Sequence, residues 1–81
     1  MLTIKVLGPG CANCRKLEEI ARAAATSAGI AAEVVKVTDM QQIVGYGVLK
    51  TPGLVIDEKL VCSGRIPGPE SVKEWIEAAA A

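Results

Sequence analysis

The hydrophobic positions in the first third of the chain change from a continuous run to a helical spacing. Leu2–Leu7 is apolar and contains β-branched residues, which predicts a strand that is buried on at least one face. Apolar residues then recur at helical intervals, which predicts a helix over residues 15–28, ended by Gly29. The residues of this apolar stripe are Leu17, Ile20, Ala21, Ala24 and Ala28.

A second apolar run, over residues 32–37, predicts another strand. A strand–helix–strand unit with this connection is expected to be parallel and right-handed. Asp39 is the predicted N-cap of a short helix, and Gln42 three residues later resembles the second residue of a capping box. This helix is expected to turn three apolar side chains toward the core, namely Met40, Ile43 and Val44.

The second half of the chain predicts a hairpin and a last helix. Residues 54–56 and 60–62 are typical of two short strands around the polar turn Asp57-Glu58-Lys59. Glu70-Ser71 is expected to begin a helix, and residues 78–81 are expected to be its frayed end or a disordered tail. One face of this helix carries Val72, Trp75, Ile76 and Ala79. The order βαβ–ββα predicts an α/β fold, with one domain over residues 1–81.

Composition narrows the classes of partner. The 81 residues carry nine basic and nine acidic side chains, so a balanced charge gives no indication of a nucleic-acid or acidic-membrane partner. Lys5 interrupts the first apolar run, and no apolar run is long enough to span a bilayer. We therefore expect no signal peptide, no membrane partner, a cytoplasmic location and a monomer.

The strongest candidate chemistry is the pair Cys11 and Cys14, at the point where the first strand hands over to the first helix. A helix N-terminus carries partial positive charge, and a thiol there ionises more easily to the reactive thiolate. We predict Cys11 as the nucleophile and Cys14 as the resolving thiol of a dithiol–disulfide cycle. The same spacing also serves zinc and copper sites, and a buried thiol pair without a role is the structural alternative.

Three further residues carry weaker signals. Pro52 follows Thr51 directly before a predicted strand, where a trans peptide bond would be the default. Cys62 lies within the second hairpin strand and is interpreted mainly as a small core residue, with a regulatory or intermolecular disulfide as the alternative. Trp75 has the helical spacing of a core residue, and nothing in the sequence supports contact with a substrate.

The motifs Cys11-Ala12-Asn13-Cys14, 51–57 and 63–67 together resemble the thioredoxin superfamily, and its small, glutaredoxin-sized members in particular. The resemblance covers nearly the whole chain. It implies a thioredoxin-like fold with a four-stranded mixed sheet, in the order 2-1-3-4, flanked by three helices. It also implies a cis Pro52 that packs against the cysteine pair, with Thr51, Pro52 and Gly64 forming a substrate groove.

The implied activity is reduction of protein disulfides by a thiol–disulfide oxidoreductase. The redox-active Cys11–Cys14 disulfide would then suffice without a cofactor or metal, the substrates would be disulfide-containing proteins, and a thioredoxin-reductase-type donor would resupply electrons. Departures from the family pattern are Gly10 before the first cysteine and Arg65 after Gly64, and no dedicated glutathione site is expected. Lys5 stands where thioredoxins carry a buried acid, so the proton acceptor for Cys14 is not assigned by the sequence.

Two other classes of protein use a similar cysteine motif. Small metal carriers also place two cysteines between a first strand and a first helix, but they follow the order βαββαβ and end on a strand. The chain is expected to end on a helix, and this order favours the oxidoreductase. A redox-sensing module that modulates a partner would use the same site, and this alternative stays open.

Overall fold

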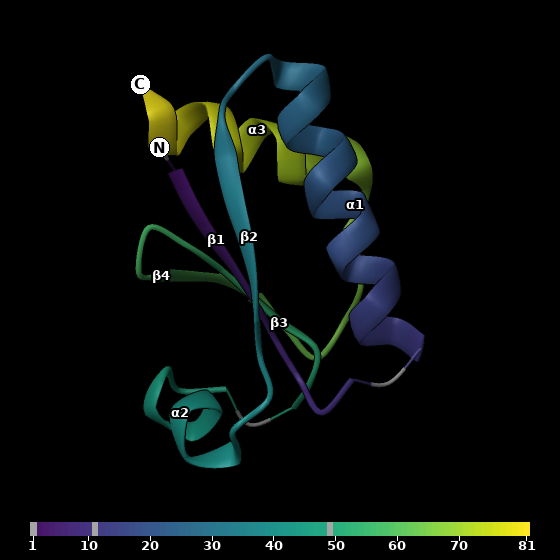
Figure 1. Ribbon diagram of the computed structural model, residues 1–81, viewed down its shortest axis with the longest axis vertical. Coiled ribbons are helices and arrows are strands. Elements are labelled where there is room, and N and C mark those ends of the chain that lie inside the picture. Colours follow the sequence, from purple (N-terminus) through teal and green to yellow (C-terminus); the bar gives the residue numbers. More distant parts are fainter. Residues whose placement is uncertain (1, 11, 49) are drawn as a thin grey trace.

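The computed structural model describes residues 2–10, 12–48 and 50–81. The elements follow the predicted order along the chain (Figure 1). They are β1 (Leu2–Leu7), α1 (Ala12–Ala28), β2 (Ala32–Val37), α2 (Met40–Gly45), β3 (Gly53–Ile56), β4 (Lys59–Ser63) and α3 (Pro69–Ala80).

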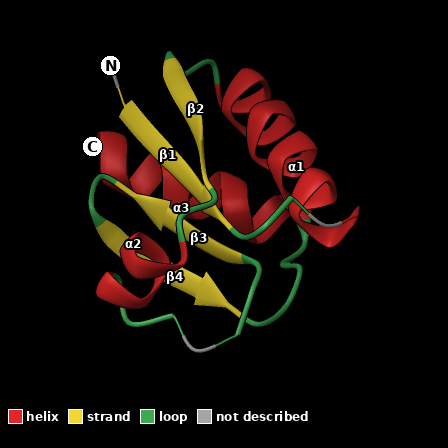
Figure 2. Ribbon diagram, turned by 60° about the horizontal axis from the view of Figure 1, so that its bottom comes forward, coloured by secondary structure: helices red, strands yellow, loops and turns green. Residues whose placement is uncertain are grey.

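The four strands form one mixed sheet in the order β2-β1-β3-β4, as the resemblance implies. β1 pairs in parallel with β2 and antiparallel with β3, so β1 lies inside the sheet (Figure 2). Leu7 at the end of β1 pairs with Gly53 at the start of β3. This register brings the segment after β1 and the segment before β3 to the same end of the sheet, where the cysteine motif begins.

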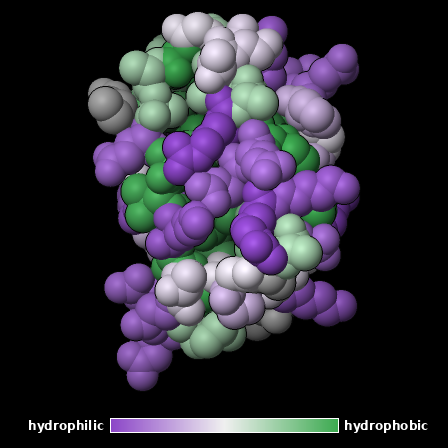
Figure 3. Space-filling model, turned by 45° about the vertical axis from the view of Figure 1, so that its right-hand side comes forward, coloured by the Kyte–Doolittle hydropathy of each residue, from purple (hydrophilic) through white to green (hydrophobic). Residues whose placement is uncertain are grey.

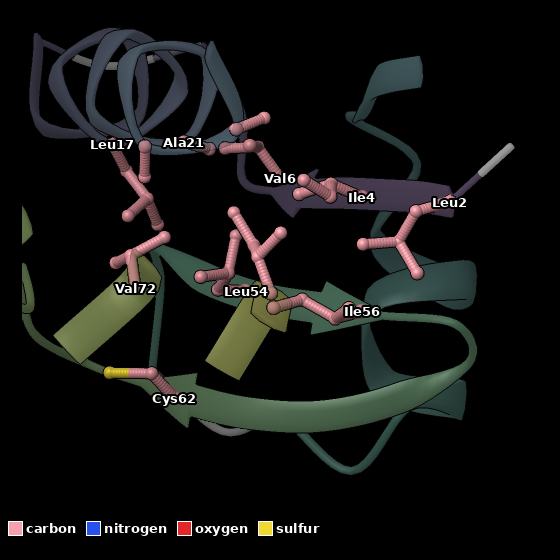
Figure 4. Packing of buried hydrophobic residues seen from close by; sticks show 12 residues of the cluster. Leu2, Ile4, Val6, Leu17, Ala21, Leu54, Ile56, Cys62 and Val72 are labelled. Atoms are coloured by element: carbon pink, nitrogen blue, oxygen red, sulfur yellow. The ribbon is translucent and has the colours of Figure 1, made fainter. Parts of the chain in front are cut away.

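Alternate side chains of β1 enter two separate apolar clusters, one on each face of the sheet. Leu2, Ile4 and Val6 pack with β3, α1 and α3, and Figure 4 shows these side chains meeting Leu54 and Leu17. The opposite face holds a smaller cluster made of Leu7, Val37, Ile43, Val48 and Val55. Two helices therefore cover one face, and the short α2 covers part of the other.

The first turn of α1 differs from the sequence expectation. The helix begins at Ala12, three residues earlier than predicted, so Cys14 lies within it. Cys14 is buried and continues the inward stripe of Leu17 and Ala21, whereas Ile20 is only half-buried. The inward stripe of α1 therefore begins at Cys14 itself. Figure 3, which views the side where α1 lies, shows hydrophilic side chains over much of the surface.

The prediction that three apolar side chains of α2 face the core is wrong for two of them. Ile43 is buried, but Met40 and Val44 are 56% and 61% exposed. A helix of only six residues has too few turns to present a broad apolar face, and it reaches the sheet through one side chain. The N-cap is confirmed at Asp39, whose carboxylate accepts from the backbone N–H of Gln41 at 2.8 Å.

The hairpin turn is tighter than the three-residue turn suggested by the sequence. Lys59 already belongs to β4, so only Asp57 and Glu58 connect the strands, with φ of 48° and 68°. Both residues occupy the left-handed region that a type I′ turn requires, where Asn-Gly is usual. Bonds to β1 hold the turn, since Asp57 N–H donates to the Thr3 carbonyl at 2.9 Å and Thr3 N–H donates to the Asp57 carboxylate at 3.2 Å.

The last helix includes most of the alanine run. α3 continues to Ala80, and its buried side chains are Val72 and Ile76, with Trp75 half-buried against the larger cluster. Ala79, expected on the inner face, is exposed. Among the helices of the described ranges, none combines the length and apolar character needed to cross a membrane.

Candidate active site

The sulfur of Cys14 lies against the backbone of Gly8. A Cβ built on Gly8 would overlap Cys14 Sγ and would stand 3.7 Å from Thr51 Cβ. Gly8 is buried although it opens a turn, and its N–H donates to the Val37 carbonyl at 2.9 Å, which fixes its position at the end of β1. The absence of a side chain at Gly8 therefore provides the space that the Cys14 sulfur occupies.

The role of Gly8 beside Cys14 is not among the expectations from the sequence. A signal for its role existed in the pattern, because Gly8 directly follows a fully apolar strand end, where a side chain would point into the core. The distance along the chain from Gly8 to Cys14 conceals their contact. Cys11 lies outside the described residues, so its assignment as the nucleophile stays a prediction.

Thr51, Pro52 and Gly64 come together beside this cysteine. The Thr51–Pro52 peptide bond is cis, as the resemblance implies, and Pro52 is buried while Thr51 is half-buried. The Gly64 N–H donates to the Pro52 carbonyl at 2.9 Å, which joins the loop after β4 to the segment before β3. Thr51 is adjacent to Gly8, so the residues of the expected groove are contiguous with Cys14.

A hollow of about 200 Å³ lies on the β2 side of Cys14. Its lining residues are Val6, Gly8, Gly10, Cys14, Arg15, Glu18, Lys36 and Thr38. Glu18 follows Cys14 by one helical turn, and its carboxylate lies 2.8 Å from the Arg22 guanidinium and 3.4 Å from Lys36 Nζ. Hydrogen bonds from Arg22 first, and then from Lys36, hold the pKa of Glu18 below its ordinary value, so Glu18 carries its charge.

Lys5 lies on the other face of the sheet and is held there by two partners. Its ammonium donates to Tyr46 OH and to the Glu58 carboxylate, each at 2.6 Å, and it lies 5.3 Å from the centre of the Tyr46 ring. The hydrogen bond with Glu58, and then that with Tyr46, raises the pKa of Lys5. Lys5 therefore remains an ammonium ion at neutral pH and is not the acceptor of the Cys14 proton. In this respect the chain differs from thioredoxins that carry a buried acid at this position.

The same cluster predicts a pH-dependent contribution to stability from Glu58. Hydrogen bonds from Lys5 and then Tyr46 lower the pKa of Glu58 below its ordinary 4.5. A lowered pKa in the folded state stabilises the protein above the unfolded-state value, and that contribution is lost as pH falls through the folded-state value. Glu58→Gln is therefore expected to lower Tm at about pH 7, with the difference from wild type shrinking as pH falls below the ordinary 4.5 and through the lowered folded-state pKa.

The control for this prediction is Glu77→Gln, at an exposed position on α3. Thermal melts of the three proteins across the acidic range provide the measurement. A Glu58→Gln effect that keeps its full size at the acidic end would contradict the electrostatic origin.

Cys62 is 6% exposed within the larger cluster, and its Sγ lies 3.8 Å from the Arg65 carbonyl oxygen, which is consistent with a small core residue.

Across the described ranges, no group of three or more His, Cys, Asp or Glu side chains is arranged to hold a metal ion. The chain also ends on a helix, which is not the element order of the small metal carriers.

Comparison with known proteins places these features in a family. A family model described as a thioredoxin domain matches residues 2–77. The thioredoxin of Methanothermobacter thermautotrophicus is 42% identical over 74 residues, which cover 91% of this chain and 96% of that protein. The thioredoxin of Methanocaldococcus jannaschii is 38% identical over 78 residues, which cover 96% of this chain and 90% of that protein.

A solved structure, that of a Nu-class GST from Haemonchus contortus, superimposes on 96% of this chain with a TM-score of 0.48 and 20% identity, and the chain spans 36% of its length. The family match and the two archaeal relatives extend over nearly the whole chain. The chain therefore belongs to the thioredoxin family and is a thioredoxin-like redox protein.

Proposed function

We propose that the chain reduces disulfide bonds of other proteins through a dithiol–disulfide cycle of Cys11 and Cys14. The observation that carries this proposal is the packing of Cys14 against Gly8, next to Thr51, at the first turn of α1. A buried thiol at a helix start, beside a segment that an extended peptide could approach, suits the resolving partner in disulfide exchange. Membership of the thioredoxin family supports the same chemistry.

The cycle has two exchange steps. Cys11 thiolate attacks one sulfur of the substrate disulfide, forms a mixed disulfide and releases the other substrate sulfur as a thiolate. Cys14, after losing its proton, attacks the Cys11 sulfur, which releases the second substrate thiolate and leaves Cys11–Cys14 oxidised. Two electrons thus pass to the substrate, and a dithiol donor, such as a thioredoxin-reductase-type protein, returns them to the pair. No other redox group is needed for this balance.

Thr51, Pro52 and Gly64 are proposed to bind the substrate chain beside the cysteines. Thr51 is half-buried and Gly64 is exposed, so their backbones can be approached from solvent, whereas Pro52 is buried. An extended peptide would add main-chain hydrogen bonds at this edge, and such contacts tolerate many side chains. The groove would therefore bind many substrate sequences, and the cysteines would supply the chemistry.

The test is a pair of trapping variants in a Cys62→Ala background, which removes the third cysteine of the chain. Cys14→Ser cannot resolve the intermediate, so it is expected to accumulate mixed disulfides through Cys11 with a disulfide-containing peptide. Cys11→Ser is expected to accumulate none, and the parent with both cysteines is expected to turn over with a dithiol donor. Intact mass spectrometry under denaturing conditions measures the adducts directly.

Three results would decide against the proposal or its assignment of roles. Equal trapping by the two variants, or trapping by neither, would contradict the roles of Cys11 and Cys14. Stoichiometric copper or zinc on the anaerobically purified protein, lost in both variants, would instead favour a metal carrier.

A further inference from the structure

We propose that the surface around Pro52 selects disulfides whose flanking residues are acidic, an inference that rests on the proposed function and specifies its substrate class. The surface is bordered by three cationic side chains, Arg15, Lys50 and Arg65, here called the basic rim. All three are exposed.

Lys50 lies beside Gly64 on one side of Pro52, and Arg65 follows Gly64 in the same loop. The stem of Lys50 covers Gly64, since a Cβ built there would lie 3.1 Å from Lys50 Cβ and 3.7 Å from its Cδ. Gly64 is itself bonded to the Pro52 carbonyl, and Arg65 is the next residue. The loop after β4 therefore carries one cation of the rim and supports the stem of another.

Arg15 lies on the other side, next to Cys14. It shares the lining of the hollow with Gly8 and Cys14, and Gly8 is adjacent to Thr51. A peptide that crosses Thr51 and Pro52 to reach the cysteines would thus pass between Arg15 and the pair on the loop. The rim borders the path of the substrate on both sides.

The rim has no ion-pair partner among the residues that the structure describes. Within the described ranges the ion pairs are Lys5–Glu58, Arg22–Glu18 and Lys36–Glu18, and none includes a residue of the rim. Two acidic groups near this end of the sheet are already engaged. Glu18 is shared by Arg22 and Lys36, and the carboxylate of Asp39 caps the N-terminus of α2.

Four acidic residues lie away from the cysteine end of the molecule. Glu33 lies at the start of β2 and Asp57 in the hairpin turn, which contacts Thr3 near the start of β1. Glu74 lies at the middle of α3 and Glu77 in its second half, and the end of this helix is near the N-terminus in Figure 1. The chain has no net charge, so any preference at the rim depends on the local placement of these cations rather than on an excess of basic residues.

A local group of cations without ion pairs favours one kind of partner. Complementary charge raises the association rate and orients the encounter, whereas like charge opposes it. A disulfide flanked by Asp or Glu would be attracted to the basic rim, and one flanked by Lys or Arg would be repelled. Exposed charges are screened over about 8 Å at physiological salt, so the preference should weaken as salt increases.

The test compares two cyclic peptides that share one disulfide loop and differ in four flanking residues, which are Glu in one and Gln in the other. At low ionic strength kcat/KM for the Glu peptide is expected to exceed that for the Gln peptide by about fivefold, and the ratio is expected to fall toward one in concentrated salt. The double variant Lys50→Gln/Arg65→Gln is expected to lose most of this ratio.

The matched control is Lys59→Gln/Lys73→Gln, which removes the same charge from β4 and α3, away from the rim. It is expected to keep the wild-type ratio. Equal kcat/KM for the two peptides in the wild type, or the same loss of ratio in the control, would overturn the proposal while leaving disulfide reduction intact. Failure to reduce either peptide would overturn the proposed function, and the inference with it.

Discussion

Gly8→Ala is expected to slow the resolving step of the cycle by about tenfold or more, while the protein still folds. The new methyl group would occupy the position of Cys14 Sγ, so the thiol must rotate or the end of β1 must move. Overpacking of this kind costs about 1–3 kcal/mol, and about 1.4 kcal/mol in a barrier is tenfold in rate. The cost falls on the sulfur that must reach Cys11, so resolution is affected more than the first attack.

The measurement separates the two exchange steps. Cys11 is loaded with a coloured aryl thiol in rapid mixing, and its release by Cys14 is followed optically, in a Cys62→Ala background. The control is Gly45→Ala at the end of α2, where an added Cβ meets no atom within 4 Å and the backbone φ is not positive. Resolution at the wild-type rate in Gly8→Ala would show that the sulfur has another productive position, and would remove the proposed reason for a glycine there.

The strands and the long helices could be predicted because their signals are local. The β-branched runs at 2–7 and 32–37 form strands with the expected bounds, and the sheet order follows the resemblance. The Cys11/Cys14 motif is also a short-range signal. The contact of Gly8 with Cys14 is different, because it depends on the angle at which α1 leaves the turn, and spacing along the chain contains no such angle.

The surroundings of Lys5 and α2 show a second limit of sequence reasoning. Lys5, Tyr46 and Glu58 are far apart in the chain and meet only because β1 pairs with β3 and α2 returns over the sheet. Their mutual bonds decide that Lys5 stays charged. Similarly, Met40 and Val44 have apolar side chains of the kind found in cores, but the short α2 leaves them exposed to solvent. Tertiary contacts determine both outcomes.

Leu17→Ala is expected to lower the free energy of unfolding by about 2–5 kcal/mol, a large part of the roughly 5–15 kcal/mol of a typical domain. Leu17 is fully buried on α1, one turn after Cys14, and packs with the larger cluster. Ala at this position favours helix slightly, so the loss reports the missing contacts and the cavity rather than helix propensity. Urea denaturation gives the value from the midpoint at an unchanged slope.

The control is Val44→Ala, which shortens an apolar side chain that is 61% exposed on α2 and should change stability by about 0.5 kcal/mol or less. Equal losses in the two variants would mean that α1 is not anchored through Leu17. The anchoring matters for the chemistry, because Leu17 and Cys14 lie on the same inward stripe. A helix that loosens at Leu17 would release the sulfur from Gly8, so in Leu17→Ala the resolving step is expected to slow together with the loss of stability.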